Sequence, residues 1–303
     1  MALFAGEEIA KMKIEDFPFL DEYANLTGYD KQTLLDAYSI ESHYHKLLLE
    51  ETSAVKRKGL YNELYNQILP LYAKGKKDKK SHLVDKAHMV AMFNKEIKVG
   101  SVIDLGCGNG SFLKNIHQRY PEKRLVGVDV YRPEAPIEGV EFIAGDVVSF
   151  RMKENFDTVI SDNVIEHLVP EDFEVYLKSV NELLNAKGKL IIILPNRLFG
   201  PSDITRIIDF TYSGKVEANG GHVNESTYTD IISVLRRQGF DNIKTVLPIP
   251  KLKYGLLKNV RVSPSPFVAM ENSKFWLWLF RRIKVKGKCP IRFTVTLVCE
   301  KTS

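Results

Sequence analysis

The sequence predicts an α/β fold, a doubly wound, Rossmann-like sheet of seven mainly parallel strands with helices on both faces. Three observations support this. From residue 100 onward, short apolar segments alternate with helical ones, as a parallel sheet with crossover connections requires. A glycine-rich turn follows the first apolar segment directly. The 303 residues, 44% of them hydrophobic, suffice for one such domain and an accessory part.

Five strands are expected between residues 100 and 200, with the sequences SVIDLG, RLVGVDV, VEFIAGDV, FDTVISDN and GKLIIILPN. SFLKNIHQRY after the first strand and EDFEVYLKSVNELL before the fifth are amphipathic and predict helices. Nearer the C-terminus, ESTYTDIISVLRRQGF predicts a helix ending near Gly239, and DNIKTVLPIP and RFTVTLVCEK predict strands. The alternation therefore continues to the end of the chain.

Helical spacing also marks residues 1–73 and 82–96, with a break expected at Pro70 and the lysine-rich stretch behind it. We predict an N-terminal helical cap region over 1–95 and the α/β domain over 96–303. An insertion is expected at about 250–289.

Composition narrows the setting of the protein. No window has the roughly 18 apolar residues of a transmembrane helix, and the N-terminus is a poor signal peptide. Cys107, Cys289 and Cys299 form neither a disulfide framework nor a metal-binding spacing. We therefore expect a cytoplasmic protein. The net charge of +5 is concentrated in two runs, within 74–80 and 281–288, which are solvated faces or sites for an anionic partner.

Segment 274–286, KFWLWLFRRIKVK, joins an apolar stretch to a basic one. Three interpretations compete: a lid over an apolar acceptor, core packing, and contact with a membrane surface. An interfacial helix carries apolar and basic residues on opposite faces. Here they mostly follow one another along the chain, which weakens the membrane-surface interpretation and leaves at most peripheral membrane contact.

The strongest motif is VIDLGCGNGSF, in which Asp104, Gly106, Gly108 and Gly110 read D-x-G-x-G-x-G between a strand and a helix. Glycines permit a sharp turn and a close approach of ligand to backbone. The dinucleotide fingerprint would place its third glycine at position 111, which is Ser111. A second cofactor of nucleotide type, S-adenosylmethionine, has no phosphate. It carries an ammonium group instead, for which Asp104 is a suitable partner.

The next strands also end in short polar residues. Asp129 ends the second strand, where a carboxylate accepts hydrogen bonds from ribose hydroxyls. Asp146 ends the third strand and is followed by Val147. This pair suits an adenine, although Asp146 could instead be a turn residue without a ligand. Asn163 ends the fourth.

The chain resembles class I S-adenosylmethionine-dependent methyltransferases, closely over about 100–200. The resemblance lies in the order and spacing of five motifs: DLGCGNGSF, GVDV, AGDV, FDTVISDNVIEHL and GKLIIILPN. The resemblance implies S-adenosyl-L-methionine as cofactor. Asp104 and the 106–110 turn would hold its methionine part, Asp129 the ribose, Asp146 and Val147 the adenine, and Asn163 would lie near the methyl group. The cofactor-binding set expected is Asp104, Gly106, Cys107, Gly108, Gly110, Asp129, Val130, Asp146, Val147 and Asn163.

Catalytic candidates follow the fourth and fifth strands. Glu166 and His167 resemble the Glu-His pair of quinone-biosynthesis and related small-molecule O-methyltransferases. Some of those enzymes add an acid four residues before the histidine to bind a metal. That position is Asn163 here, and we predict no metal. His167 is a candidate general base or a helix-start residue, and His222, in GGHVN, is a second candidate or a helix-entry residue.

Arg57, Tyr61 and Tyr65 share a helix face that either touches the ligands or serves packing. The expected function is methyl transfer, at oxygen, to a small molecule or a glycan or lipid precursor. The alternatives are an enzyme acting on RNA or protein, and a non-catalytic binding protein. Nucleic acid is disfavoured because no RNA-binding module is recognisable, and an NAD-dependent oxidoreductase because of Gly110 and Ser111. The oligomeric state is not predicted.

Overall fold

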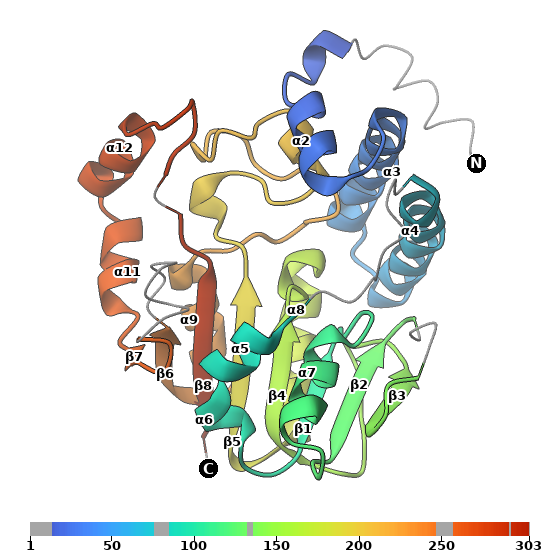
Figure 1. Cartoon of the computed structure of the whole chain (residues 1–303), viewed down its shortest axis with the longest axis vertical. Coiled ribbons are helices and arrows are strands. Elements are labelled where there is room, and N and C mark those ends of the chain that lie inside the picture. Colours follow the sequence, from blue (N-terminus) through green and yellow to red (C-terminus); the bar gives the residue numbers. More distant parts are fainter. Residues whose placement is uncertain (1–13, 76–84, 132–135, 247–256, 291, 303) are drawn as a thin grey trace.

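In the computed structural model, which describes residues 14–75, 85–131, 136–246, 257–290 and 292–302, a central sheet has helices on both faces (Figure 1). The strand order is β3-β2-β1-β4-β5-β8-β6-β7. The strands are β1 (Val102–Leu105), β2 (Leu125–Asp129), β3 (Val140–Ala144), β4 (Phe156–Asp162), β5 (Leu184–Leu194), β6 (Phe240–Val246), β7 (Arg261–Val262) and β8 (Val295–Lys301).

The predicted doubly wound α/β class is confirmed. Strands β1 to β5 are parallel, and β8 is antiparallel to both β5 and β6. The described sheet has eight strands where seven were expected, because the two-residue strand β7 pairs with the edge of β6. It lies within the predicted insertion, for which the sequence indicated no strand.

Both faces of the sheet are apolar, so its central strands are nearly continuous apolar runs. Along β5, Leu190 and Ile192 face one core, while Ile191 and Ile193 face the other. The first core is covered by α8 (Pro170–Leu183) and α9 (Tyr228–Arg237), and the second by α5 (Ala87–Met92), α6 (Asn94–Ile97) and α7 (Ser111–Arg119). Because successive side chains of a strand point to opposite faces of the sheet, β5 contributes to both cores.

A third core belongs to the N-terminal helices and joins them to the segment after β5. They are η1 (Ile14–Asp16), α2 (Leu20–Thr27), α3 (Lys31–Glu50) and α4 (Ala54–Gly75). The break expected at Pro70 is wrong, since α4 continues through it to Gly75. Proline removes one helical hydrogen bond, but Ile68 is buried before it and the Gly75 carbonyl accepts a hydrogen bond from the Asp30 N–H at 3.3 Å. The lysines at 76–80 lie outside the described residues.

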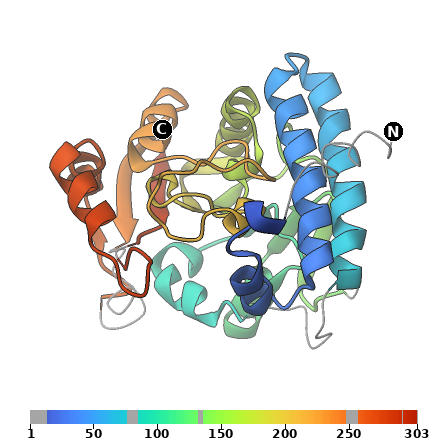
Figure 2. The same cartoon turned by 90° about the horizontal axis from the view of Figure 1, so that it is seen from above.

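The chain reverses its strand order between β1 and β4, which opens a crevice at the carboxyl ends of the strands. Helices α3 and α4 stand on one side of this end of the sheet, and α11 (Ser265–Glu271) and α12 (Lys274–Arg282) lie on the other (Figures 1 and 2). Between them, Figure 2 shows the loops that carry η3 (Arg197–Phe199) and η4 (Ile204–Ile207). The sequence boundary between cap and α/β domain stays a prediction. Within the described part of the chain, no helix combines the length and apolar character needed to cross a membrane.

Candidate functional site

A cavity of about 1340 Å³ lies at the carboxyl edge of the sheet, beneath α4. Its floor comes from the turns after β1, β2, β3 and β4, and its wall from Tyr61 and Tyr65 of α4. Seven of the ten predicted cofactor residues line it: Gly106, Gly108, Asp129, Val130, Asp146, Val147 and Asn163. Asp104, Cys107 and Gly110 are buried behind this lining. The cavity is large enough for a nucleoside-sized ligand together with a second small molecule.

The turn after β1 needs glycine for two reasons. Gly106 and Gly108 have φ angles of 78° and 53°, in the left-handed region that strains other residues. At Gly106 a Cβ would also lie 2.5 Å from a methyl carbon of Val164, whereas at Gly108 it would meet nothing within 4 Å. Gly108 therefore leaves free space beside the cavity, and its N–H points to Asp129.

Asp129 ties the first two turns together. Its Oδ2 accepts a hydrogen bond from the Gly108 N–H at 2.8 Å, and its Oδ1 accepts one from the Tyr131 N–H at 3.2 Å. Burial raises the pKa of this carboxyl, and the backbone donors oppose that rise. The carboxylate is thus held rigidly at the cavity wall, with lone pairs left to accept further hydrogen bonds.

Asp104 lies one layer deeper, opposite Gly127 of β2 and Ile160 of β4. It is 2% exposed, and its Oδ1 has no hydrogen-bond partner among the described residues. Burial, and then the neighbouring Asp162, raise its pKa, and Lys86 lowers it. A buried carboxylate oxygen without a donor is costly, so a cationic group placed beside it would be stabilised.

The turns after β3 and β4 show two further features. Asp146 caps its own turn by accepting a hydrogen bond from the Val148 N–H, and its other oxygen lies 3.3 Å from Lys58 Nζ of α4. Asn163 has a φ of 57°, a conformation that asparagine tolerates better than other side chains. Asn163 therefore takes up a conformation that redirects the chain from β4 along the cavity edge.

The N-terminal cap is fastened to this edge by a buried ion pair that the sequence did not reveal. Arg57 Nε and Nη2 donate to the two carboxylate oxygens of Asp172 on α8, at 2.9 and 2.6 Å. Tyr61 donates to the same carboxylate and accepts a hydrogen bond from the Val169 N–H at 3.0 Å. Of the predicted Arg57, Tyr61 and Tyr65 face, the arginine therefore serves packing, while both tyrosines also line the cavity.

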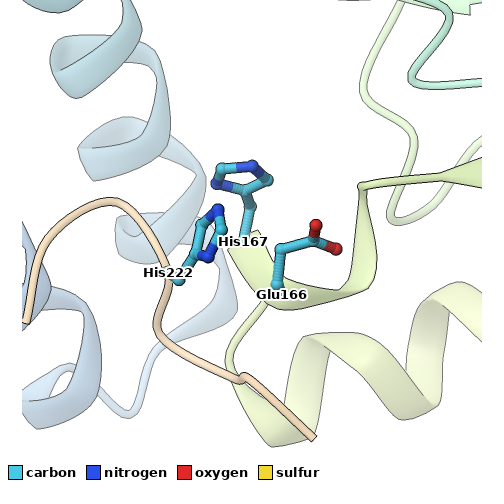
Figure 3. A group of neighbouring side chains, drawn as sticks. All are labelled: Glu166, His167 and His222. Atoms are coloured by element: carbon cyan, nitrogen blue, oxygen red, sulfur yellow. The ribbon is translucent and has the colours of Figure 1, made fainter. Parts of the chain in front are cut away.

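The three catalytic candidates come together although they derive from two separate segments. Glu166 and His167 lie on η2 (Ile165–His167), and His222 reaches them from the loop before α9 (Figure 3). The rings of His167 and His222 meet edge to face with centroids 4.7 Å apart. Of the three, His167 lines the cavity. Glu166 is fully buried, and neither of its carboxylate oxygens has a partner among the described residues.

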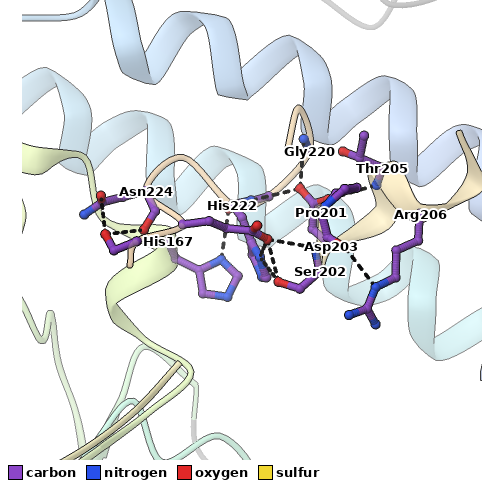
Figure 4. Close-up of polar contacts among 12 residues, drawn as sticks. His167, Pro201, Ser202, Asp203, Thr205, Arg206, Gly220, His222 and Asn224 are labelled. Atoms are coloured by element: carbon purple, nitrogen blue, oxygen red, sulfur yellow. Dashed lines mark hydrogen bonds and ion pairs between the residues drawn. The ribbon is translucent and has the colours of Figure 1, made fainter. Parts of the chain in front are cut away.

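The hydrogen bonds of the two rings define their roles. His167 Nδ1 lies 3.0 Å from the Gly221 carbonyl oxygen, which can only accept, so Nδ1 carries the proton and a neutral ring leaves Nε2 as an acceptor. His222 Nδ1 lies 3.0 Å from Ser202 Oγ (Figure 4). The same atom lies 2.7 Å from Glu225 Oε1. The ring of His222 is thus held by a buried carboxylate.

These environments separate the pKa values of the two histidines. Burial, and then the charge of His222, lower the pKa of His167 to about 3. Burial also opposes charge on His222, but the bond to Glu225 and the carboxylates of Asp203 and Glu166 outweigh it and raise the pKa of His222 to about 9. Near neutral pH, His167 is therefore neutral and His222 is an imidazolium. Burial raises the pKa of Glu166 to about 7.

The loop that carries His222 is held by two acids that the sequence analysis missed. Glu41 of α3 accepts a hydrogen bond from the Gly221 N–H at 2.7 Å and another from the Tyr72 hydroxyl at 2.8 Å. Asp203 accepts hydrogen bonds from the N–H groups of Gly220 and His222, at 2.9 and 3.3 Å (Figure 4). Both acids are isolated in sequence and lack a motif, so only the tertiary fold reveals them.

The cluster of the three catalytic candidates has the spacing of a metal centre. One ligand atom each from Glu166, His167 and His222 lie within 4.8 Å of one another. The absence of a metal, inferred from Asn163, stays a prediction.

The interpretation of segment 274–286 as a lid is wrong. No residue of this segment lines the large cavity, and α12 lies on the other side of the molecule from α4 (Figures 1 and 2). The core interpretation holds for Phe280 alone on α12, since most of the helix is exposed.

The chain is similar to known methyltransferases. A family model described as "Methyltransferase domain" matches residues 70–245, more than half of the chain. A trans-aconitate 2-methyltransferase of Escherichia coli is 26% identical over 111 residues, which are 35% of this chain and 43% of that protein. The chain thus spans less than half the length of this relative.

Two solved structures are also similar to the chain. Human N-acetylserotonin methyltransferase, in complex with SAM, is similar with a TM-score of 0.50 and 14% identity, over 89% of this chain and 70% of that one. The 1,6-didemethyltoxoflavin-N1-methyltransferase of Burkholderia thailandensis is similar with a TM-score of 0.47 and 15% identity, over 86% and 91%.

Proposed function

The chain belongs to the methyltransferase-domain family, as its motifs predicted, and we propose that it transfers a methyl group from S-adenosylmethionine to an oxygen of a small-molecule acceptor. The acceptor class includes glycan and lipid precursors. One observation supports this above the rest: the glycine turn with Asp129 and the ring of His167 line the same cavity. The proposed cofactor residues and a proton acceptor thus share one cavity.

The chain's own residues suit this cofactor. Gly108 leaves the backbone of the 106–110 turn open to a ligand, and Asp129 offers carboxylate lone pairs suited to ribose hydroxyls. Asp104 has an unsatisfied buried oxygen next to that turn, which suits an ammonium group. Asp146 would exchange its exposed partner Lys58 for the adenine amino group, with Val147 beside the ring. When bound, S-adenosylmethionine supplies an activated methyl group and leaves as a neutral thioether.

His167 is the proposed general base. Its Nδ1–H is held by the Gly221 carbonyl, so its Nε2 accepts the proton that an acceptor hydroxyl loses as its oxygen gains the methyl group. A pKa of about 3 keeps the ring unprotonated before reaction but makes it a weak base. It therefore acts late, when the new bond has already acidified the hydroxyl. His222 and Glu166 are positioning residues behind it.

The trans-aconitate methyltransferase relative suggests a second acceptor chemistry, because aconitate is a carboxylate. A carboxylate acceptor has no proton to lose and requires no base. Turnover that is insensitive to removal of His167 would favour such an acceptor over a hydroxyl.

Ligand-dependent unfolding tests the proposal. S-adenosylhomocysteine should raise the midpoint of thermal unfolding, whereas NAD should not, because only a ligand bound by the folded state stabilises it. No stabilisation by either the methyl donor or its demethylated product would contradict the proposal. Transfer of label from methyl-labelled S-adenosylmethionine to fractionated small metabolites, compared with RNA and protein fractions, would then identify the acceptor class.

A further inference from the structure

Helix α12 presents an aromatic face to solvent. Phe275, Trp276 and Trp278 are 61%, 39% and 51% exposed, and only Phe280 of this helix is buried. The rings of Phe275 and Trp278 stack with centroids 6.3 Å apart, and Trp276 stacks on Phe280 at 5.8 Å. Phe280 thus anchors the helix while its neighbours face outward. Soluble domains rarely leave several large apolar side chains together in water.

The chain continues this surface beyond the helix. Ile283 and Val285 are 37% and 58% exposed, and a bridge between Val285 and Lys288 turns the segment back on itself. Exposed apolar side chains thus continue from the helix into this turn. We call the exposed residues of both segments the α12 surface: Phe275, Trp276, Trp278, Ile283 and Val285 with the cations Arg281, Arg282, Lys284 and Lys286.

The charge of this surface is of one sign. Residues 272–299 contain no Asp or Glu, whereas 274–288 contain six Lys and Arg residues, enough to account for the whole net charge of +5. Most arginines elsewhere are paired with carboxylates, namely Arg57, Arg124, Arg151, Arg197, Arg237 and Arg261. In contrast, the four cations of the α12 surface form no ion pair with a described carboxylate.

The helix also brings charge and aromatic rings together. Phe275, Trp278 and Arg282 are spaced by three and four residues, so they share one helix face. The guanidinium of Arg282 lies 5.0 Å from the centre of the Trp278 ring. Although apolar and basic residues follow one another along the chain, Arg282 therefore lies beside the aromatic side chains in space.

We propose that the α12 surface binds the surface of an anionic lipid bilayer. Exposed Trp and Phe beside Lys and Arg are the side chains that enter the interface between lipid headgroups and acyl chains. Unpaired cations are attracted to the negative potential of such a surface. Exposed Ile283 and Val285 gain nothing from a nucleic acid, which favours lipid as the occupant. A helix of nine residues lies in the interface and does not cross it.

The sequence offers a direct probe, because its two tryptophans, Trp276 and Trp278, both lie on α12. Vesicles of phosphatidylglycerol and phosphatidylcholine should therefore shift the tryptophan emission to shorter wavelength and sediment the full-length protein. Vesicles of phosphatidylcholine alone should do neither, and high salt should reverse the effect.

Two double variants separate the contribution of the aromatic side chains from that of the cations. Phe275→Ser with Trp278→Ser should lower partitioning into the anionic vesicles about tenfold or more. Arg281→Gln with Arg282→Gln should lower it about thirtyfold. The matched control is Lys98→Gln with Lys178→Gln, which removes two exposed cations outside this surface and should change partitioning little.

Three results would overturn the proposal. The first is no emission shift with anionic vesicles, and the second is equal binding by wild type and both α12 variants. The third is a tryptophan emission that is already at short wavelength in buffer alone, together with a dimer in light scattering. The α12 surface would then join two copies of the chain. An emission shift with RNA but not with vesicles counts against lipid in the same way. None of these results depends on methyl transfer.

Discussion

The two halves of the cavity are built in different ways. The proposed cofactor half comes from one continuous stretch, about 104–163, in which four strand ends each deliver a short turn to the same edge, and the rest of the cavity is the proposed acceptor half. The acceptor half is assembled from α4, η2, α8 and, behind them, α3 and the loop that carries His222. Local sequence therefore determines the first half, whereas the second half exists only once distant segments have packed together. The two halves should respond differently to substitution.

The largest effect is expected where the cap is fastened to the α/β domain. Arg57→Ala should lower the free energy of unfolding by about 3–5 kcal/mol, because it leaves the 4% exposed Asp172 as a buried, unpaired charge. Urea unfolding measures this change. Lys56→Ala, at the exposed neighbouring position, is the matched control. The double variant Arg57→Ala with Asp172→Ala should cost less than the sum of the two single changes, and additivity would show that the pair is not coupled.

The rate of methyl transfer should depend most on the acceptor half of the cavity. His167→Ala should lower turnover about 10²–10³-fold on a hydroxyl acceptor, because the proton acceptor in the cavity is lost. The dissociation constant of S-adenosylhomocysteine should change little. His222→Gln should lower turnover less, since His222 acts through His167. Steady-state rates with calorimetric binding of the product separate the two quantities, and a parallel loss of both would place His167 in the cofactor half instead.

Cofactor affinity should depend on the turns at the strand ends. Asp129→Ala should weaken S-adenosylhomocysteine about 100-fold, because hydrogen bonds to a charged group are worth about 1.5–3 kcal/mol each. Asp241→Ala, on the exposed part of β6, is the control. Calorimetric titration gives the dissociation constants, with the thermal midpoint checked for each variant. Equal affinity of wild type and Asp129→Ala would remove this carboxylate from the cofactor site.

The same contrast explains what could be predicted. The strand–turn–helix order, and the placement of Gly106, Asp129, Asp146 and Asn163 at one edge, follow from periodicity and from parallel strands ending together. Glu41 and Asp203 were missed because an isolated acid on a helix or loop has no pattern. The helix through Pro70 was missed because tertiary packing outweighed a local breaker. The lid interpretation of segment 274–286, one of three that the sequence left open, was wrong because composition does not reveal which side of the sheet an insertion covers.

The smallest effect expected concerns pH and the loop that positions His167. Burial, and then Asp203, raise the pKa of Glu41 to about 7, against the Tyr72 and Gly221 hydrogen bonds and the charge of His222. A raised carboxyl pKa means that folding favours the protonated form. The stability from this group is therefore full below about pH 4.5 and is lost as the pH rises through about 7.

Glu41→Gln imitates the protonated state, because an amide can accept from the Gly221 N–H and donate to the Tyr72 oxygen. Between pH 5 and 8, we expect wild type to lose about 2–2.5 kcal/mol relative to this variant. Urea unfolding at four pH values measures the difference, with the exposed Glu50→Gln on the same helix as control. Superimposable pH curves for wild type and Glu41→Gln would mean that Glu41 is ionised throughout, and that its contact with Gly221 holds the acceptor half by charge at every pH.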